Sequence, residues 1–244
     1  ANVDFSPIVD SHIASGADIT AVYANDVITV EQAQKATVFG INDEGRVVDV
    51  LTNPYISGAC NVSLNMFVLS KEILKNLVLE ANSHGLVSFE KDILQARTHD
   101  YKIMAYRFDG YFSKITSMDT FYKANMNLLN TENRNKLFIA NRPIYTKVRD
   151  NPPAKFGIGA KVKNSLIGDG CIIEGTVENS ILFRGVKVGK GAVVKNCILM
   201  QDTHVGAKCE VSCVISDKNV KIGDMRMLTG SENYPLYLGK GAEI

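Results

Sequence analysis

One lysine in this chain stands where its chemistry needs an explanation. Lys114 lies in the stretch YFSKITSMDTFYKAN, residues 111–125, between a hydroxyl residue and an apolar one and just before a segment predicted to be helical. A lysine ammonium has three donors and no acceptor, so it cannot ligate a divalent cation such as magnesium, which needs oxygen ligands. Two interpretations stay open from these residues alone: an ordinary surface lysine or a functional position.

The cysteines offer a second candidate chemistry. Cys209 and Cys213 are four residues apart, but no second pair stands at metal-ligand spacing and the nearest histidine is His204. We therefore interpret both as small buried residues rather than as zinc ligands, because a free cysteine packs like a small hydrophobic residue. Five cysteines, an odd number, also argue against a disulfide framework and favour a reducing, cytoplasmic location.

Composition excludes several classes of partner. The chain has 244 residues, 45% of them apolar, which is enough for one large domain or two modest ones. Lys plus Arg number 27 and Asp plus Glu number 26, so no global field would attract nucleic acid or an anionic membrane. No apolar run is long enough for a membrane span, and the first residues do not resemble a signal peptide. We expect neither nucleic acid nor membrane as a partner.

The elements that would position these residues alternate between strands and helices over residues 1–140. Strands are predicted at 18–23, 36–41, 47–51 and 101–108, and helices over 71–84, from residue 88, and from 116 or 117 to 128. Turn residues at 42–45 predict that the second and third strands form a hairpin. Ser70 and Gly85 supply the cap and the stop of the first helix. This pattern predicts an α/β sheet domain.

The rest of the chain has a different character. Residues 141–156 contain three prolines and read as an extended linker. In residues 157–244, short apolar pairs that follow Asn164, Asn179, Asn196 and Ser212 recur at separations of 15, 17 and 16 residues. Short repeats punctuated by glycine and asparagine do not keep a helical period. They predict a hexapeptide-type, left-handed parallel β-helix with three short strands in each coil.

The predicted β-helix suggests roles for its other residues. Cys171, Cys197, Cys209 and Cys213 would be small, semi-buried residues of the coils, and the tail at 232–244 would cap the open end. An acyltransferase that uses His204 as a general base is one alternative function. Against it, His204 is the only histidine of this segment, and the coils lack the long loops that such a site needs.

Local motifs along nearly the whole chain resemble the bacterial ADP-glucose pyrophosphorylase (glucose-1-phosphate adenylyltransferase) family. Ala36-Thr-Val-Phe-Gly40, Ser63-Leu-Asn-Met-Phe67 and Phe89-Glu-Lys-Asp92 are similar to strand and helix motifs of that family. Asp119-Thr-Phe-Tyr-Lys-Ala-Asn125 resembles its Glu-Ala-Tyr-Trp-Lys-Ala-Asn helix, and Pro152-Pro-Ala-Lys-Phe156 resembles its linker. The resemblance implies a partial, Rossmann-like nucleotidyltransferase domain followed by the β-helix. The family's glycine-rich nucleotide loop and first metal aspartate have no counterpart in these residues.

Two departures from the family stand at positions that carry its chemistry. The family has Glu-Lys-Pro where this sequence has Thr52-Asn53-Pro54, and its lysine holds the sugar phosphate. The family also has Trp-Arg-Asp-Val-Gly-Thr before the helix, where the aspartate is one of two magnesium ligands, and Lys114 stands at that place. An ammonium about 4 Å from a divalent ion would cost on the order of 8 kcal/mol at an effective dielectric constant of 20. Thr52, Asn53 and Lys114 are therefore interpreted as degenerate positions.

The resemblance implies a D-type, non-catalytic subunit that modulates a catalytic ADP-glucose pyrophosphorylase subunit in glycogen synthesis. The expected assembly is a hetero-oligomer, a tetramer, that uses the β-helix. Magnesium is the cofactor of active family members, and no cofactor or catalytic residue is assigned to this chain. Gly40, Ser63 and Asn53 are candidates for lining a vestigial pocket for a sugar phosphate or a nucleotide; for Gly40 and Ser63, close packing is the alternative explanation.

A catalytically active nucleotidyltransferase with rearranged ligands stays open as another hypothesis. In it, Asp109 or Asp119 would replace the lost carboxylate. Asp119 has a simpler explanation, because a carboxylate in the first turn of a helix interacts favourably with the helix dipole.

Overall fold

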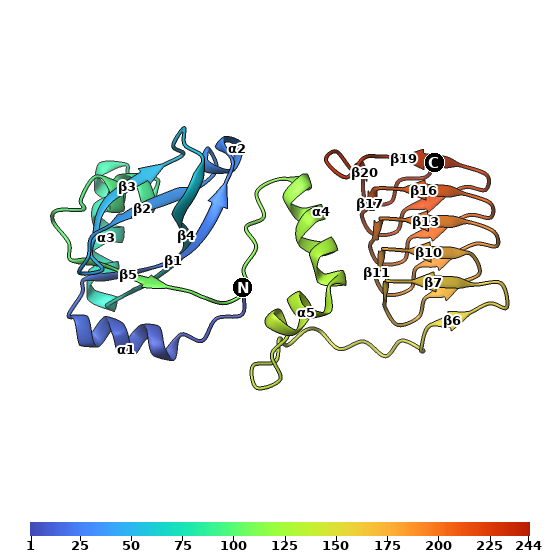
Figure 1. Ribbon diagram of the computed structural model, residues 1–244, viewed down its shortest axis with the longest axis horizontal. Coiled ribbons are helices and arrows are strands. Elements are labelled where there is room, and N and C mark those ends of the chain that lie inside the picture. Colours follow the sequence, from blue (N-terminus) through green and yellow to red (C-terminus); the bar gives the residue numbers. More distant parts are fainter. The chain divides into compact units, whose positions relative to one another are not determined.

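The computed structural model describes residues 1–244 (Figure 1). Its contacts form two compact units, one of residues 3–110 and one of residues 1–2 together with 111–244. None of its helices combines the length and the apolar composition that a membrane-spanning helix requires.

The unit of residues 3–110 is built on a five-stranded sheet in the order β3-β2-β4-β1-β5. Its strands are β1 (Ile19–Ile28), β2 (Thr37–Ile41), β3 (Val47–Thr52), β4 (Gly58–Leu69) and β5 (Ile103–Arg107). Its helices are α1 (Ser6–Ser15), α2 (Val30–Ala33), α3 (Lys71–His84) and the π-helix η1 (Phe89–Gln95). Only β1 and β5 pair in parallel, so the predicted α/β region is confirmed with a mainly antiparallel sheet.

Local signals account for several of these elements. The Ser70 hydroxyl accepts a hydrogen bond from the Ile73 amide, and Gly85 ends α3 at φ 66°, as predicted. The predicted hairpin is β2–β3, and its turn reaches β5, where the Ala105 amide donates to the Gly45 carbonyl at 2.9 Å. The core of this unit consists of Ile19, Ala21, Phe39, Val47, Val50, Leu94 and Ile103.

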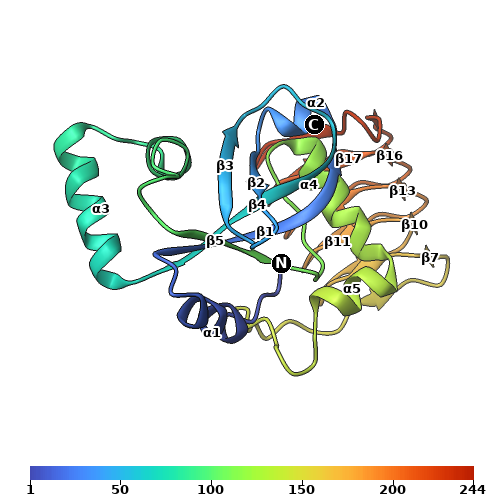
Figure 2. The ribbon, with the colours of Figure 1, turned by 60° about the vertical axis from the view of Figure 1, so that its left-hand side comes forward.

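The second unit contains a short helical segment and a parallel β-helix. The helices are α4 (Met118–Met126), the 3-10 turn η2 (Asn127–Leu129) and α5 (Thr131–Leu137). Three parallel five-stranded sheets form the β-helix (Figures 1 and 2). The three sides and the stacked coils match the predicted hexapeptide-repeat architecture.

The strands of each sheet are stacked in chain order. The first sheet contains β6 (Lys155–Phe156), β9 (Ile172–Ile173), β12 (Lys187–Val188), β15 (His204–Val205) and β18 (Lys221–Ile222). The second contains β7 (Lys161–Lys163), β10 (Thr176–Glu178), β13 (Val193–Lys195), β16 (Glu210–Ser212) and β19 (Met227–Thr229). The third contains β8 (Leu166–Ile167), β11 (Ile181–Leu182), β14 (Ile198–Leu199), β17 (Val214–Ser216) and β20 (Leu236–Leu238).

Small and aliphatic residues fill the β-helix and turn its corners. Cys171, Cys197 and Cys209 lie in the coils, as predicted, but they are fully buried among the stacked valines rather than semi-buried. At one corner, which we call the asparagine corner, Asn164, Asn179, Asn196 and Cys213 all have positive φ between 44° and 52°. Asparagine tolerates this left-handed conformation better than other non-glycine residues, which explains the asparagines in the repeat.

Helix α4 lies along the third sheet in both views (Figures 1 and 2). Tyr122 is 3% exposed and packs on Ile198 and Ile215, and its hydroxyl donates to the Asn196 carbonyl at 2.7 Å. The division between the two units therefore falls at residue 110, earlier than the predicted domain boundary at 140/141, because α4 buries its apolar face on the β-helix.

The tail adds a coil to the β-helix. Leu236–Leu238 pairs in parallel with Val214–Ser216, and the Lys221 amide donates to the Ala242 carbonyl. The expected cap at 232–244 is thus a further coil of the same kind, which covers the preceding coil by continuing its hydrogen-bond pattern.

Candidate functional site

The first candidate position lies at the end of β3. Asn53 follows the strand at φ 52°, is exposed, and donates its backbone amide to the Ala36 carbonyl at 2.9 Å. The Thr52 hydroxyl donates to Oε1 of Gln95, the last residue of η1, at 3.1 Å. The side chains at the family's Glu-Lys position are thus neutral here. They can form hydrogen bonds with a ligand, but they supply no charge that would bind phosphate strongly.

Gly40 lies opposite Asp49 in the β2–β3 ladder. A Cβ atom added at Gly40 would lie 3.0 Å from the Asp49 Cβ atom, closer than side chains normally approach. Close packing against the neighbouring strand therefore explains the glycine without a ligand.

Ser63 is fully buried at an irregularity in β4. Its hydroxyl accepts a hydrogen bond from the Asn65 amide at 3.1 Å, and Asn65 has φ 55°. The register of the β1–β4 pair shifts between Val22 and Tyr23, the residues that face this place. Ser63 thus stabilises a bulge, and a bulge of this kind can redirect a strand beside a pocket.

Lys114 lies in the second unit, in a stretch without regular structure that leads into α4. Its side chain is partly exposed. The helix that follows is fixed by a capping box: the Ser117 hydroxyl accepts from the Thr120 amide, and the Thr120 hydroxyl accepts from the Ser117 amide. Of the two predicted cap residues, Thr116 and Ser117, the structure selects Ser117.

Asp109 and Asp119, the carboxylates considered as alternative metal ligands, already have partners. Asp109 lies 2.6 Å from the Arg107 guanidinium, and Asp119 lies 3.0 Å from the Lys123 ammonium one helical turn later. No group of three or more His, Cys, Asp or Glu residues could hold a metal ion. With an ammonium at residue 114, the side chains present do not fit magnesium, and no chemical step is assigned to a metal here.

His204 lies on the outer face of the first sheet of the β-helix, between Lys187 and Lys221 in the parallel register. Its ring has no hydrogen-bond partner that would orient it as a general base. The cysteines are equally unsuited to catalysis. Burial raises the pKa of the Cys197 thiol to about 12, and the Cys209 thiol donates to the Gly223 carbonyl at 2.9 Å.

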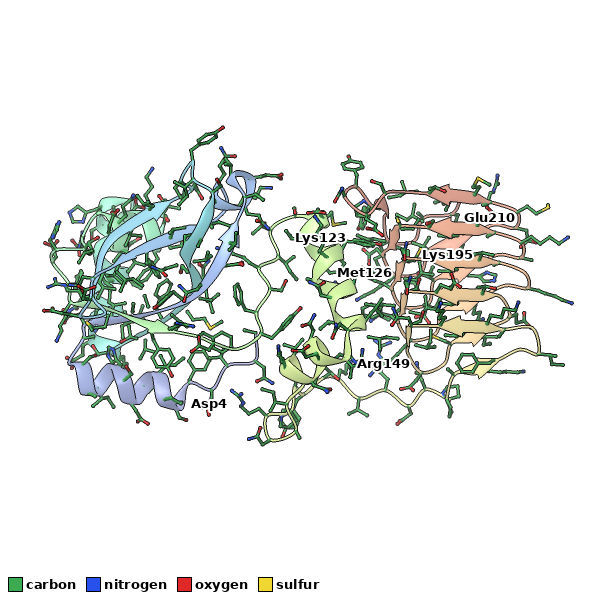
Figure 3. The ribbon with its side chains drawn as sticks, viewed as in Figure 1. Asp4, Lys123, Met126, Arg149, Lys195 and Glu210 are labelled. Carbon is green, nitrogen blue, oxygen red and sulfur yellow. The ribbon has the colours of Figure 1, made fainter.

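The structure adds a groove that sequence reasoning missed. It has a volume of about 550 Å³ and lies between residues 146–149 and the third sheet of the β-helix. Its apolar floor includes Leu166 and Ile181, and Lys147, Arg149 and Arg184 bring positive charge to it (Arg149 is labelled in Figure 3). None of the three forms an ion pair within the chain, so the groove can accept an anion. In the sequence, the signal for this groove was the pair of cations Lys147 and Arg149 in the proline-containing segment 141–156.

Comparison with known proteins places the chain among relatives. A family model described as GlmU-like, C-terminal hexapeptide, matches residues 152–232. The glycogen biosynthesis protein GlgD of Bacillus subtilis (strain 168) is 41% identical over 179 residues, which cover 73% of this chain and 52% of that protein.

Two glucose-1-phosphate adenylyltransferases extend the similarity. The protein of Geobacillus stearothermophilus is 34% identical over 79% of this chain and 50% of its own length. That of Bacillus mycoides (strain KBAB4) is 30% identical over 95% of this chain and 62% of its own length. The chain thus spans about half to three fifths of the length of these relatives.

Proposed function

This chain belongs to the glucose-1-phosphate adenylyltransferase family, and from that premise we propose that it is part of a non-catalytic, regulatory subunit in glycogen biosynthesis. The observation that carries the proposal is Lys114. At the place where the family resemblance puts a magnesium-binding aspartate, an ammonium repels the cation instead of ligating it.

The end of β3 supports the same proposal from a separate unit. Asn53 occupies the place of the phosphate-binding lysine, and its positive φ suits asparagine better than lysine. The hydroxyl of Thr52 is already committed to Gln95. A variant that restores the family residue at only one of positions 53 and 114 would therefore still carry an unfavourable residue at the other.

The proposed partner is a catalytic subunit that makes ADP-glucose and pyrophosphate from ATP and glucose 1-phosphate. The proposed assembly is a tetramer that uses the β-helix, in the cytoplasm. The basic groove at Lys147, Arg149 and Arg184 supports a regulatory ligand of the sugar-phosphate or nucleotide class, because three cations without an internal ion pair favour a phosphate group.

The test is pyrophosphate release from ATP and glucose 1-phosphate with magnesium, by the natural protein that contains this sequence, purified alone. We expect no turnover from a folded sample, and a change in the rate of the catalytic subunit when the two are mixed. Turnover in the ordinary range of about 1 to 1000 per second by the protein alone would overturn the proposal.

Two variants make this test sharper. We expect the unmodified protein to show no turnover. The double variant Lys114→Asp/Asn53→Lys, which restores both family residues, should release pyrophosphate at a measurable rate. Lys71→Asp, at an exposed helix start, makes the same charge change as Lys114→Asp and is the matched control. An unmodified protein that is active, and loses activity in the double variant, would show that the ligands are rearranged rather than lost.

A further inference from the structure

One side of the β-helix carries an ordered pattern of charge to which the proposed function assigns no partner. In the second sheet, the central residue of each strand points inward, and Val177, Val194 and Val211 are buried. The residues on either side point outward in two columns set by the parallel register. One column is Lys161, Thr176, Val193, Glu210 and Met227, and the other is Lys163, Glu178, Lys195, Ser212 and Thr229.

We call these two columns the ladder face. Its side chains are exposed or partly exposed, whereas α4 packs on the third sheet. Glu178 and Lys195 form an ion pair at 3.2 Å along one column. Lys161 and Glu210, on the first and fourth strands of the other column, form no ion pair within the chain. Figure 3 labels Lys195 and Glu210 on neighbouring strands of this face.

We propose that the ladder face binds the ladder face of a second copy of this chain, antiparallel, across a two-fold axis between β10 and β13. A two-fold contact is isologous, so each residue must suit its own symmetry partner. With this axis, β7 faces β16 of the other copy and β10 faces β13. Lys161 then faces Glu210 of the other copy, and Glu178 faces Lys195 of the other copy. Each of these pairs occurs twice.

The uncharged positions agree with this register. Thr176 of one copy faces Val193 of the other, which places the least polar part of the first column at the two-fold axis. Lys163 faces Ser212, a neutral residue. Two of the four charge pairs lie beyond this less polar part of the first column, and the other two lie beside it in the second column.

Three other arrangements place like charges together. An axis through β10 brings Glu178 against its own copy and Lys163 against Lys195. An axis through β13 brings Lys195 against its own copy. A parallel arrangement, with the axis along the β-helix, places Lys161 against Lys163. Like charges at an interface suppress these arrangements. An axis between β7 and β10 pairs only Lys163 with Glu178, and an axis between β13 and β16 forms no opposite-charge pair. The register with the axis between β10 and β13 therefore has the most opposite-charge pairs and no like-charge pair.

The test is sedimentation of the 244-residue chain alone, at low and high salt and at about 100 µM protein, where even a weak dimer forms. We expect a reversible dimer that weakens as salt rises, because exposed ion pairs are screened. Glu210→Lys and Lys161→Glu should each weaken the dimer by about tenfold or more, since each creates two repulsive pairs. The double variant Lys161→Glu/Glu210→Lys restores all pairs and should dimerise as the unmodified chain does.

Lys187→Glu is the matched control, because it reverses an exposed lysine on the neighbouring sheet face and should leave the dimer unchanged. A second measurement mixes a Thr176→Cys chain with a Val193→Cys chain under oxidation. A disulfide between the two chains, formed faster than in either chain alone, supports the register. A monomeric chain, a dimer indifferent to the reversals, or a double variant that is not restored would overturn it. Since no catalytic subunit is present, these results do not depend on the proposed function.

Discussion

The variant Tyr122→Phe removes one hydroxyl group and tests how much that group stabilises the packing of α4 on the β-helix. The ring keeps its packing on Ile198 and Ile215, but the 2.7 Å hydrogen bond to the Asn196 carbonyl is lost. That carbonyl accepts no other backbone hydrogen bond, so the change leaves it without a partner. An unsatisfied buried group costs about 1–3 kcal/mol. For a unit of this size, we expect a melting temperature lower by roughly 2–12 °C, at about 2–4 °C for each kcal/mol.

The assay is thermal and urea denaturation followed by circular dichroism, with Tyr237→Phe as the control. Tyr237 also donates from its hydroxyl, but to the partly exposed Asp217 carboxylate at 3.4 Å, and Tyr237 is 47% exposed. Its variant should unfold as the unmodified chain does. Equal stability of the Tyr122→Phe variant and the unmodified chain would refute the assignment of α4 to the β-helix unit.

The pH dependence gives an independent readout of the same residue. Burial raises the pKa of the Tyr122 phenol, with further contributions from Cys213 and other nearby acidic groups. The folded chain therefore holds this proton more tightly than the unfolded chain. Stability should be complete below the ordinary phenol pKa of about 10 and should fall as pH rises above it. The Tyr122→Phe variant should show a smaller fall, and an identical alkaline profile would count against a buried phenol.

Three other changes test separate parts of the fold. Cys213→Asn changes the fourth position of the asparagine corner. It should stabilise the chain by about 0.5–1 kcal/mol in urea denaturation, because asparagine adopts positive φ more readily than cysteine. A lower stability of this variant would contradict that explanation. Gly40→Ala should destabilise the sheet unit by about 1–3 kcal/mol through its contact with the facing strand, whereas Gly239→Ala, where an added Cβ meets nothing within 4 Å, should not. The hydrogen bonds from Arg97 lower the pKa of Glu80, so stability should be lost as pH falls through that lowered pKa; acid titrations of Glu80→Gln should lack this part of the loss.

Local signals made part of this fold predictable. A hydroxyl residue before α3 and a glycine after it define both ends of that helix, and each signal acts within a few residues. The β-helix was predictable because its repeat places asparagine at a corner that requires positive φ. The degenerate positions Thr52, Asn53 and Lys114 were found through a family resemblance, and their roles stay predictions.

Contacts between distant residues were not predictable in this way. Tyr122 and the Asn196 carbonyl are separated by 74 residues, and no local pattern indicates their hydrogen bond. The hydrogen bond from Thr52 to Gln95 also depends on how two elements pack. The segment from residue 88 was expected to be a helix, but its i→i+5 bonding leaves no distinctive pattern in sequence. The basic groove likewise arises where the proline segment passes over the third sheet.

The separation between α4 and its binding surface also sets an order of events during synthesis. Helix α4 leaves the ribosome before the coils that contain Ile198 and Ile215 exist. With 74 residues between Tyr122 and Asn196 and about 5–20 residues added per second, α4 waits roughly 4 to 15 seconds for the surface that will cover it. For that time Phe121 and Tyr122 face water on the nascent chain. The packing of α4 is therefore completed by residues from the later half of the chain.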